Sequence, residues 1–149
     1  MHDGRMGSFT KKHLCAIMAI VMLFLCFTLS ACGNKYASQY SAMAIVMTDT
    51  SNKASVSFGT FNGTYVMKLK NTSGEKAIIT YHATLEEGNI KVYYDFHNEK
   101  LNLFEIATGG SVEATTGAFT GNHTIYIMIE SDGECSEGSF SFALEKADQ

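Results

Sequence analysis

The chain has 149 residues, of which 46% are hydrophobic and 17% are charged, a balance that suits one globular domain and excludes extended disorder. Proline and tryptophan are absent, and arginine occurs once, at Arg5. The chain has no run of basic residues and a formal net charge of −4, which together argue against a nucleic-acid partner.

The N-terminal part has the pattern of a secretory signal. Lys11 and Lys12 precede residues 14–27, which are fourteen consecutive apolar residues, and no charge follows until Lys35. A basic stretch, a short apolar core and a small-residue exit are typical of a signal peptide. The alternative is an uncleaved membrane anchor, because residues 14–32 number nineteen, which is about enough to span a bilayer.

The residues that follow this apolar core are Leu29-Ser30-Ala31-Cys32. An aliphatic residue, two small residues and a cysteine resemble the lipobox of bacterial lipoproteins. The resemblance implies that residues 1–31 are a lipoprotein signal peptide, that the thiol of Cys32 receives a diacylglyceryl group, and that cleavage makes Cys32 the first residue. It also implies an acyl anchor of the palmitate type that holds the protein on the extracytoplasmic face of the cell membrane.

Cleavage before Cys32 would leave 118 residues, whose eight lysines and fourteen acidic residues give a formal net charge of −6. Such a surface disfavours nucleic acid and anionic lipid as partners. The polar segment 32–42 is expected to be a lipidated tether, and residues 43–149 are expected to form the folded domain. Residues 43–47 are apolar and begin the fold as an edge strand or, alternatively, as a short helix.

From Ala54 onward, alternating apolar and polar residues predict β-strands. In residues 90–97 every second side chain is apolar, and residues 124–130 contain isoleucine at every second position. Turns are expected at Asn62-Gly63 and at residues 87–89, among others. Eight or nine strands without a long helix predict an all-β fold, an antiparallel β-sandwich or barrel.

Two segments near the C-terminus, residues 124–129 and 138–144, are separated by a polar stretch and are predicted to form the last hairpin. They resemble the last hairpin of pre-peptidase C-terminal domains and related carbohydrate-binding-type jelly rolls. The resemblance implies a jelly-roll sandwich that serves as an accessory or binding module rather than as a catalyst. The alternation also predicts that Phe142, in the middle of its strand, is buried and that Ser141 faces outward.

Catalytic motifs are absent from the sequence. It contains no GxSxG elbow, no Walker loop, no HExxH and no CxxC. Cys15 and Cys26 belong to the signal and Cys32 is the lipid site, so Cys135 is the single remaining thiol, and no disulfide within the mature chain is expected. No cofactor is expected.

The mature histidines are His82, His97 and His123. The turn expected at residues 87–89 places His82 and His97 on adjacent strands, where they are interpreted as solvent-facing rather than as metal ligands. Three acidic residues lie in segment 131–138, which is interpreted as a solvated turn, with a weak calcium site as the alternative.

Tyrosines provide the hypothesis for a binding surface. Tyr93, Asp95 and His97 alternate on the polar face of their strand, and Tyr81 is expected to join them from the strand before. Tyrosine rings stack on sugars and peptides, so these four residues are the candidate ligand-binding surface. The alternative is that the tyrosines cover a half-buried sheet without binding anything.

Together these features predict a membrane-anchored extracytoplasmic lipoprotein whose non-catalytic β-sandwich binds a glycan or an envelope protein. Two further hypotheses stay open at this point. One is an accessory or inhibitor domain of an envelope hydrolase, and the other is a hydrolase with an unrecognised carboxylate site.

Overall fold

Nine β-strands and no helix make up residues 35–147, the part of the chain that the computed structural model describes. All strand pairings are antiparallel. The all-β antiparallel prediction is therefore confirmed. The strands are β1 (Gln39–Met43), β2 (Val46–Asp49), β3 (Lys53–Lys70), β4 (Ala77–Glu87), β5 (Asn89–Phe96), β6 (Glu99–Ala107), β7 (Gly110–Thr115), β8 (Thr124–Ser131) and β9 (Cys135–Lys146).

The predicted signal peptide and Cys32 lie outside the described residues. Within the described range, no helix is long and apolar enough to cross a membrane. Residues 43–47 form parts of β1 and β2, so the edge-strand interpretation is confirmed and the short helix is wrong. Since β1 begins at Gln39, the ordered fold starts before residue 43.

Strand β3 is the longest and has two partner strands along each edge. Thr60 pairs with both β1 and β9, and Thr64 pairs with both β1 and β8. A residue inside a sheet has one neighbour on each side. Strands β8 and β9 therefore follow one another along one edge of β3, while β1 and β2 follow one another along the opposite edge.

The same succession repeats across the molecule. Strand β4 pairs with β9, and β5, which follows β4, pairs with β8. On the far side, β7 pairs with β4 and β6 pairs with β5. The result is five long antiparallel lines. Four of them are interrupted near the middle and the continuous β3 bends there, and we call both kinds of site breaks, because the sheet folds into two layers at this position. One layer is β2-β3-β9-β4-β7 and the other is β1-β3-β8-β5-β6, with the first half of β3 in one layer and its second half in the other.

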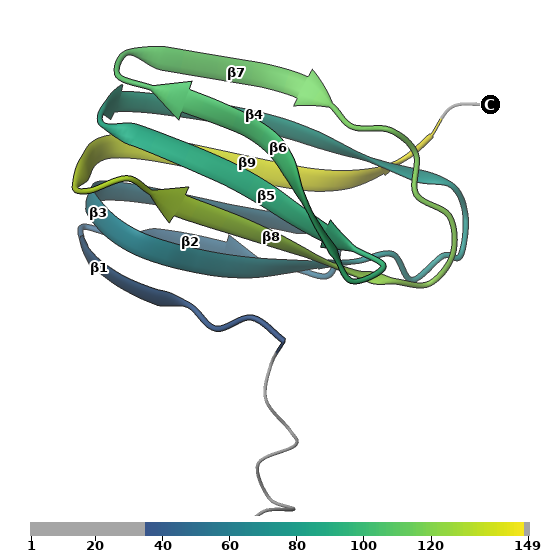
Figure 1. The fold of residues 1–149 in the computed structure, drawn as a ribbon. Helices are drawn as coiled ribbons and strands as arrows, with labels where there is room; N and C mark the ends of the chain where they lie inside the picture. The colour runs from purple at the N-terminus through teal and green to yellow at the C-terminus, as the bar shows by residue number, and fades with distance from the viewer. Residues whose placement is uncertain (1–34, 148–149) are drawn as a thin grey trace, which may run out of the picture. The chain divides into compact units, whose positions relative to one another are not determined.

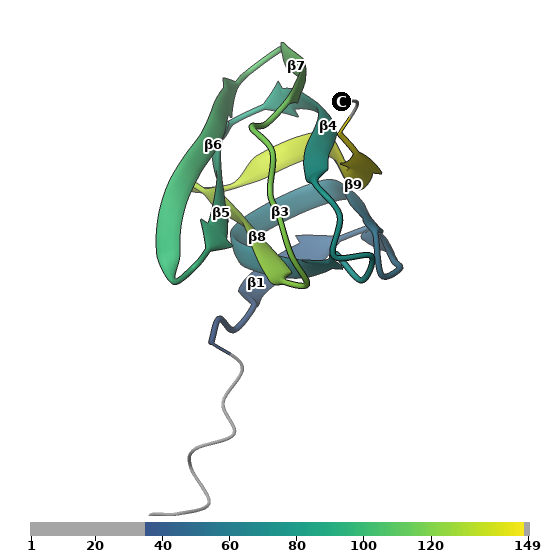
Figure 2. The same cartoon turned by 90° about the vertical axis from the view of Figure 1, so that its right-hand side faces the viewer.

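This arrangement is a double-sheet jelly roll with β1 and β2 added at its edge. Figure 1 shows the breaks together at the left-hand end of the domain. Figure 2 looks along the strands, with β5 and β6 on one side of the core and β4 and β9 on the other. The observed strand order therefore confirms the jelly-roll prediction.

Each break contains a residue whose φ lies in the left-handed region. Glycine adopts this conformation without strain, because it has no Cβ. Gly88 has a second constraint, since a Cβ at this position would lie 2.5 Å from the Sγ of Cys135. The five residues at the breaks are Ala44, Gly63, Gly88, Gly109 and Gly133.

Three predicted turns are wrong for one shared reason. Asn62-Gly63 lies inside β3, and residues 87–89 join β4 to β5 without making them a hairpin, because these strands have different partners. The predicted last hairpin is also absent, because β8 and β9 both pair with β3. In each case the residue with the left-handed φ bends the chain from one layer into the other instead of reversing its direction. We call the boundary between the two layers, where these bends lie, the fold line.

The core lies between the two layers. Ile125, Ile127 and Ile129 are fully buried on β8, and Phe140 and Phe142 are buried on β9. The predicted inward faces are therefore correct, although the two rows belong to different layers rather than to one hairpin. Aromatic stacking also connects the two layers: the rings of Tyr81, on β4 in one layer, and Phe104, on β6 in the other, lie 5.0 Å apart.

Candidate functional site

The predicted tyrosine surface lies on the outer face of the layer β1-β3-β8-β5-β6. Tyr93 is half-buried there, and the Nζ of Lys100 lies 4.1 Å from the centre of its ring. Lys100 is also 2.6 Å from the carboxylate of Glu130 on the neighbouring strand β8. The ring of Tyr93 is therefore already engaged by a cation within the same domain.

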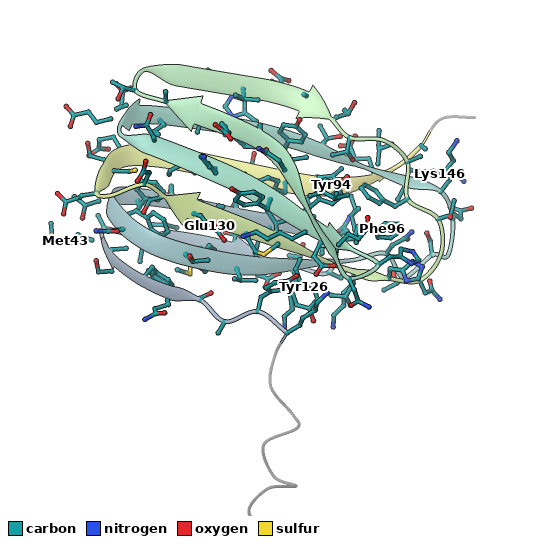
Figure 3. All side chains as sticks on the ribbon, in the orientation of Figure 1. Met43, Tyr94, Phe96, Tyr126, Glu130 and Lys146 are labelled. Carbon is teal, nitrogen blue, oxygen red and sulfur yellow. The ribbon has the colours of Figure 1, made fainter. Side chains whose placement is uncertain are left out.

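Asp95 is only 3% exposed, although it points away from the core. The hydroxyl of Tyr36 donates a hydrogen bond to its Oδ2, and the backbone N–H of Asn98 donates one to its Oδ1 at 3.1 Å. The Tyr36 ring meets the ring of Tyr126 edge-on at 5.5 Å. Tyr36 therefore covers Asp95 on this face, and we call this contact the latch. Figure 3 shows the position of Tyr126, from β8, at the lower side of the domain.

Two of the predicted residues lie elsewhere. His97 follows β5 with a left-handed φ of 57°, and its ring packs against Phe96 and, at 4.7 Å, against His123. Tyr81 points into the core, so the prediction that it joins the surface is wrong. The physical reason is that β4 and β5 are not neighbours and belong to different layers.

The expectation that His82 and His97 lie on adjacent strands is also wrong. His82 is on β4 and His97 follows β5, and β8, β3 and β9 lie between these two strands in the sheet. His82 projects from the exposed face of β4. No group of three or more histidine, cysteine or acidic side chains able to hold a metal ion occurs within residues 35–147, and the acidic segment 131–138 provides none.

A second open surface lies on the outer face of the other layer, β2-β3-β9-β4-β7. A hollow of about 350 Å³ is centred there on β3 and β9. We call this surface the serine groove: Ser55 on β3 and Ser141 on β9 line the hollow, and Ser57 and Ser139 lie next to them toward the fold line, where they line a second hollow. The strand register places two rows of side chains across the layer: Thr48, Ser55, Ser141, His82 and Glu113 in one, and Val46, Ser57, Ser139, Thr84 and Ser111 in the other.

The size of the side chains explains the hollow. Serines occupy the central strands, while longer side chains such as Lys53, His82 and Glu113 stand around them. Toward the fold line the groove continues into the second hollow, of about 940 Å³, whose floor includes Gly59. Its lining includes three carboxylates, those of Glu86, Glu87 and Glu137.

Hydrogen bonds hold part of this lining in place. The hydroxyl of Ser141 donates to the backbone carbonyl of His82 at 3.4 Å, and Ser136 donates to the Oε2 of Glu87 at 3.0 Å. At the far end, Thr80 donates to a carboxylate oxygen of Glu145, also at 3.0 Å. The groove therefore offers oriented hydroxyls that can still accept hydrogen bonds from a ligand.

Sequence reasoning missed this groove. Its signal was the repeated Ser-x-Ser pattern at residues 55–57 and 139–141, which puts two hydroxyls on the same face of each strand. The signal becomes informative only when β3 and β9 are known to pair, because the register then sets Ser55 beside Ser141 and Ser57 beside Ser139.

Cys135 is buried against the break at Gly88. Burial raises the pKa of its thiol, and a nearby Asp132 acts in the same direction, while a contact with the backbone of Asn89 lowers it. A thiol that stays protonated is a poor nucleophile. Cys135 is therefore a core residue and contributes nothing to the site.

No protein-family model matches the chain, and no curated protein matches its sequence significantly. Similar solved structures include TmCBM61 in complex with beta-1,4-galactotriose, with 14% identity, a TM-score of 0.44 and coverage of 77% of this chain and 92% of that one. A family 29 carbohydrate-binding module has 15% identity, a TM-score of 0.39 and coverage of 76% and 83%. The C-terminal CBM6 of LamC, a marine laminarinase from Zobellia galactanivorans, has 12% identity, a TM-score of 0.37 and coverage of 70% and 98%. The assignment of the fold rests on the strand order and register described above rather than on these similarities.

Proposed function

We propose that this chain is a lipoprotein anchored through Cys32 on the extracytoplasmic face of the cell membrane, and that its β-sandwich binds a neutral glycan without catalysis. The observation that supports binding is the serine groove, in which hydroxyl side chains from neighbouring strands line an open hollow. The lipobox pattern at residues 29–32 supports the anchor.

The chemistry of the groove suits a polyhydroxylated ligand. Each serine or threonine hydroxyl donates one hydrogen bond and accepts others, as a sugar hydroxyl does. The outward positions of β4 from Thr80 to Glu86 extend over six residue steps, which is about 20 Å at ~3.3 Å per residue. That length suits a short oligosaccharide rather than a single sugar. The carboxylates lining the second hollow disfavour an anionic polysaccharide.

Recognition in this groove depends on hydrogen bonds and not on ring stacking. The aromatic residues that border the hollow, Tyr81 and Phe142, are buried and present no ring face to a ligand. Each hydrogen bond contributes only about 1 kcal/mol net, so binding by one domain is expected to be weak. Display of many copies on a membrane would compensate for this weakness through avidity.

A direct test is binding of the full chain, held in detergent or in vesicles, to an array of neutral and anionic glycans. Ser141→Gln places a longer side chain in the middle of the groove and is expected to abolish binding. Ser41→Gln is the matched control, because Ser41 is an exposed serine on β1 in the other layer. Equal binding by both variants, or preference for anionic glycans, would contradict the proposal. Recovery of the bound glycan intact distinguishes a binding module from a hydrolase.

A further inference from the structure

Exposed apolar side chains gather on one edge of the domain. We call residues 39–48 the β1–β2 edge, because β1 and β2 follow one another there along β3, and Asp49 comes directly after it. Of the five large hydrophobic side chains that are exposed among the described residues, four lie on this edge and the fifth is Leu101 on β6. The four are Tyr40 at 38%, Met43 at 67%, Val46 at 65% and Met47 at 38% exposure.

The same edge lacks charge. Residues 36–48 contain no acidic or basic side chain, although the mature chain as a whole carries eight lysines and fourteen acidic residues. Contact with an apolar surface would therefore require no burial of charge along these thirteen residues. Figure 3 shows Met43 at the extreme left of the domain, at the fold line.

The contacts of residues 36–38 with the domain limit how far a lipid on Cys32 can lie from β1. Tyr36 is latched to Asp95, and the hydroxyl of Ser38 accepts a hydrogen bond from the N–H of Val66 at 2.9 Å. Only four residue steps separate Cys32 from Tyr36, which is at most about 14 Å of extended chain. A lipid on Cys32 would therefore hold the start of β1 close to the membrane.

We propose that the β1–β2 edge lies on the lipid bilayer, with the side chains of Met43 and Val46 at the boundary between headgroups and acyl chains. This inference rests on the lipidation of Cys32 in the proposed function. A few apolar side chains without charge are suited to this interfacial region, and their contact adds to the attachment that the acyl chains provide. The occupant of the edge is the membrane surface that carries the anchor, rather than a second copy of the chain.

The absence of tryptophan from the sequence allows a clean test. Met43→Trp and Leu101→Trp each introduce a single tryptophan at an exposed position, the first on the β1–β2 edge and the second on β6, at the opposite edge of the same layer. The lipidated full chain is reconstituted in phosphatidylcholine vesicles with and without brominated acyl chains. Flotation of the vesicles reports the anchor independently of the tryptophan signal.

The expected result is that brominated lipid quenches the tryptophan of Met43→Trp to less than about half of its emission, as suits a depth at the headgroup boundary, and leaves that of Leu101→Trp unchanged. Val46→Trp is expected to behave like Met43→Trp and serves as a second probe of the edge. Protein that floats with vesicles but shows equal, weak quenching at both positions would overturn this inference and leave the anchor intact. An emission shift that depends on the protein-to-lipid ratio and not on bromination would indicate self-association and would also overturn it. Protein that does not float would refute the anchor, and this inference with it.

Discussion

Replacing Phe142 by alanine tests the assignment of the inward face in β9. Phe142 is 2% exposed, and its strand lies between β3 and β4 in the middle of its layer. A buried phenylalanine removes about 150–250 Å² from water, which at ~25 cal/mol per Å² corresponds to about 4–6 kcal/mol. Alanine retains a little of this, and the cavity left beside Tyr81 adds to the loss. We expect Phe142→Ala to lower the free energy of unfolding by about 3–5 kcal/mol.

The matched control is Ser141→Ala, one residue away on the opposite face. Its hydroxyl lies in the groove with a hydrogen bond of 3.4 Å, so its removal should change the free energy of unfolding by less than about 0.5 kcal/mol. Urea denaturation of residues 36–149, followed by circular dichroism, measures both values and should show a β-type spectrum for each folded variant. A loss below about 1 kcal/mol for Phe142→Ala, or equal losses for the two variants, would refute the register.

Three further predictions follow from the anchor, the latch and the buried thiol. Cys32→Ser should abolish labelling by a fatty-acid probe and leave the unprocessed precursor in the membrane, so labelling that survives would disprove the lipobox interpretation. Tyr36→Phe removes the hydroxyl that donates to buried Asp95 and should lower the free energy of unfolding by about 1.5–3 kcal/mol, whereas an unchanged urea midpoint would show that the latch is unimportant. Burial raises the pKa of Cys135, so stability should be complete below the ordinary thiol pKa and fall as the pH rises toward the higher value of the folded state, because the unfolded chain ionises first. Cys135→Ala should flatten that alkaline decline, and an identical decline in the variant would contradict the assignment.

Local patterns were sufficient to predict the strands and their inward faces. Alternation along β8 and β9 identified the buried isoleucines and phenylalanines, because burial follows the period of a strand whichever strand it pairs with. The same is true of the outward position of Tyr93 and Asp95 on β5. The class of fold follows from these features alone.

Pairing between distant strands could not be derived from local patterns. A glycine with a left-handed φ is compatible with a reversal and with a bend, and Gly63 and Gly88 both bend the chain. The expected position of Tyr81 on the candidate ligand-binding surface is wrong for this reason, and local patterns do not reveal the groove on the outer face of β3 and β9. The latch depends on a contact between residues 36 and 95, which are separated by 59 positions in the sequence.

The uncharged β1–β2 edge has a consequence for solubility. An edge strand presents unpaired backbone groups, and natural proteins usually protect such strands with charge, proline or a covering segment. Residues 42–47 have none of the first two protections, and the apolar sequence Ala-Met-Ala-Ile-Val-Met resembles the short segments that stack into cross-β aggregates. Proteolysis ahead of Tyr36 would release the domain from the proposed anchor and expose this edge to other released copies. If Cys32 anchors the chain as proposed, we therefore expect the released form to precipitate at concentrations where the tethered form stays dispersed, because only the tethered form would have a membrane to cover this edge.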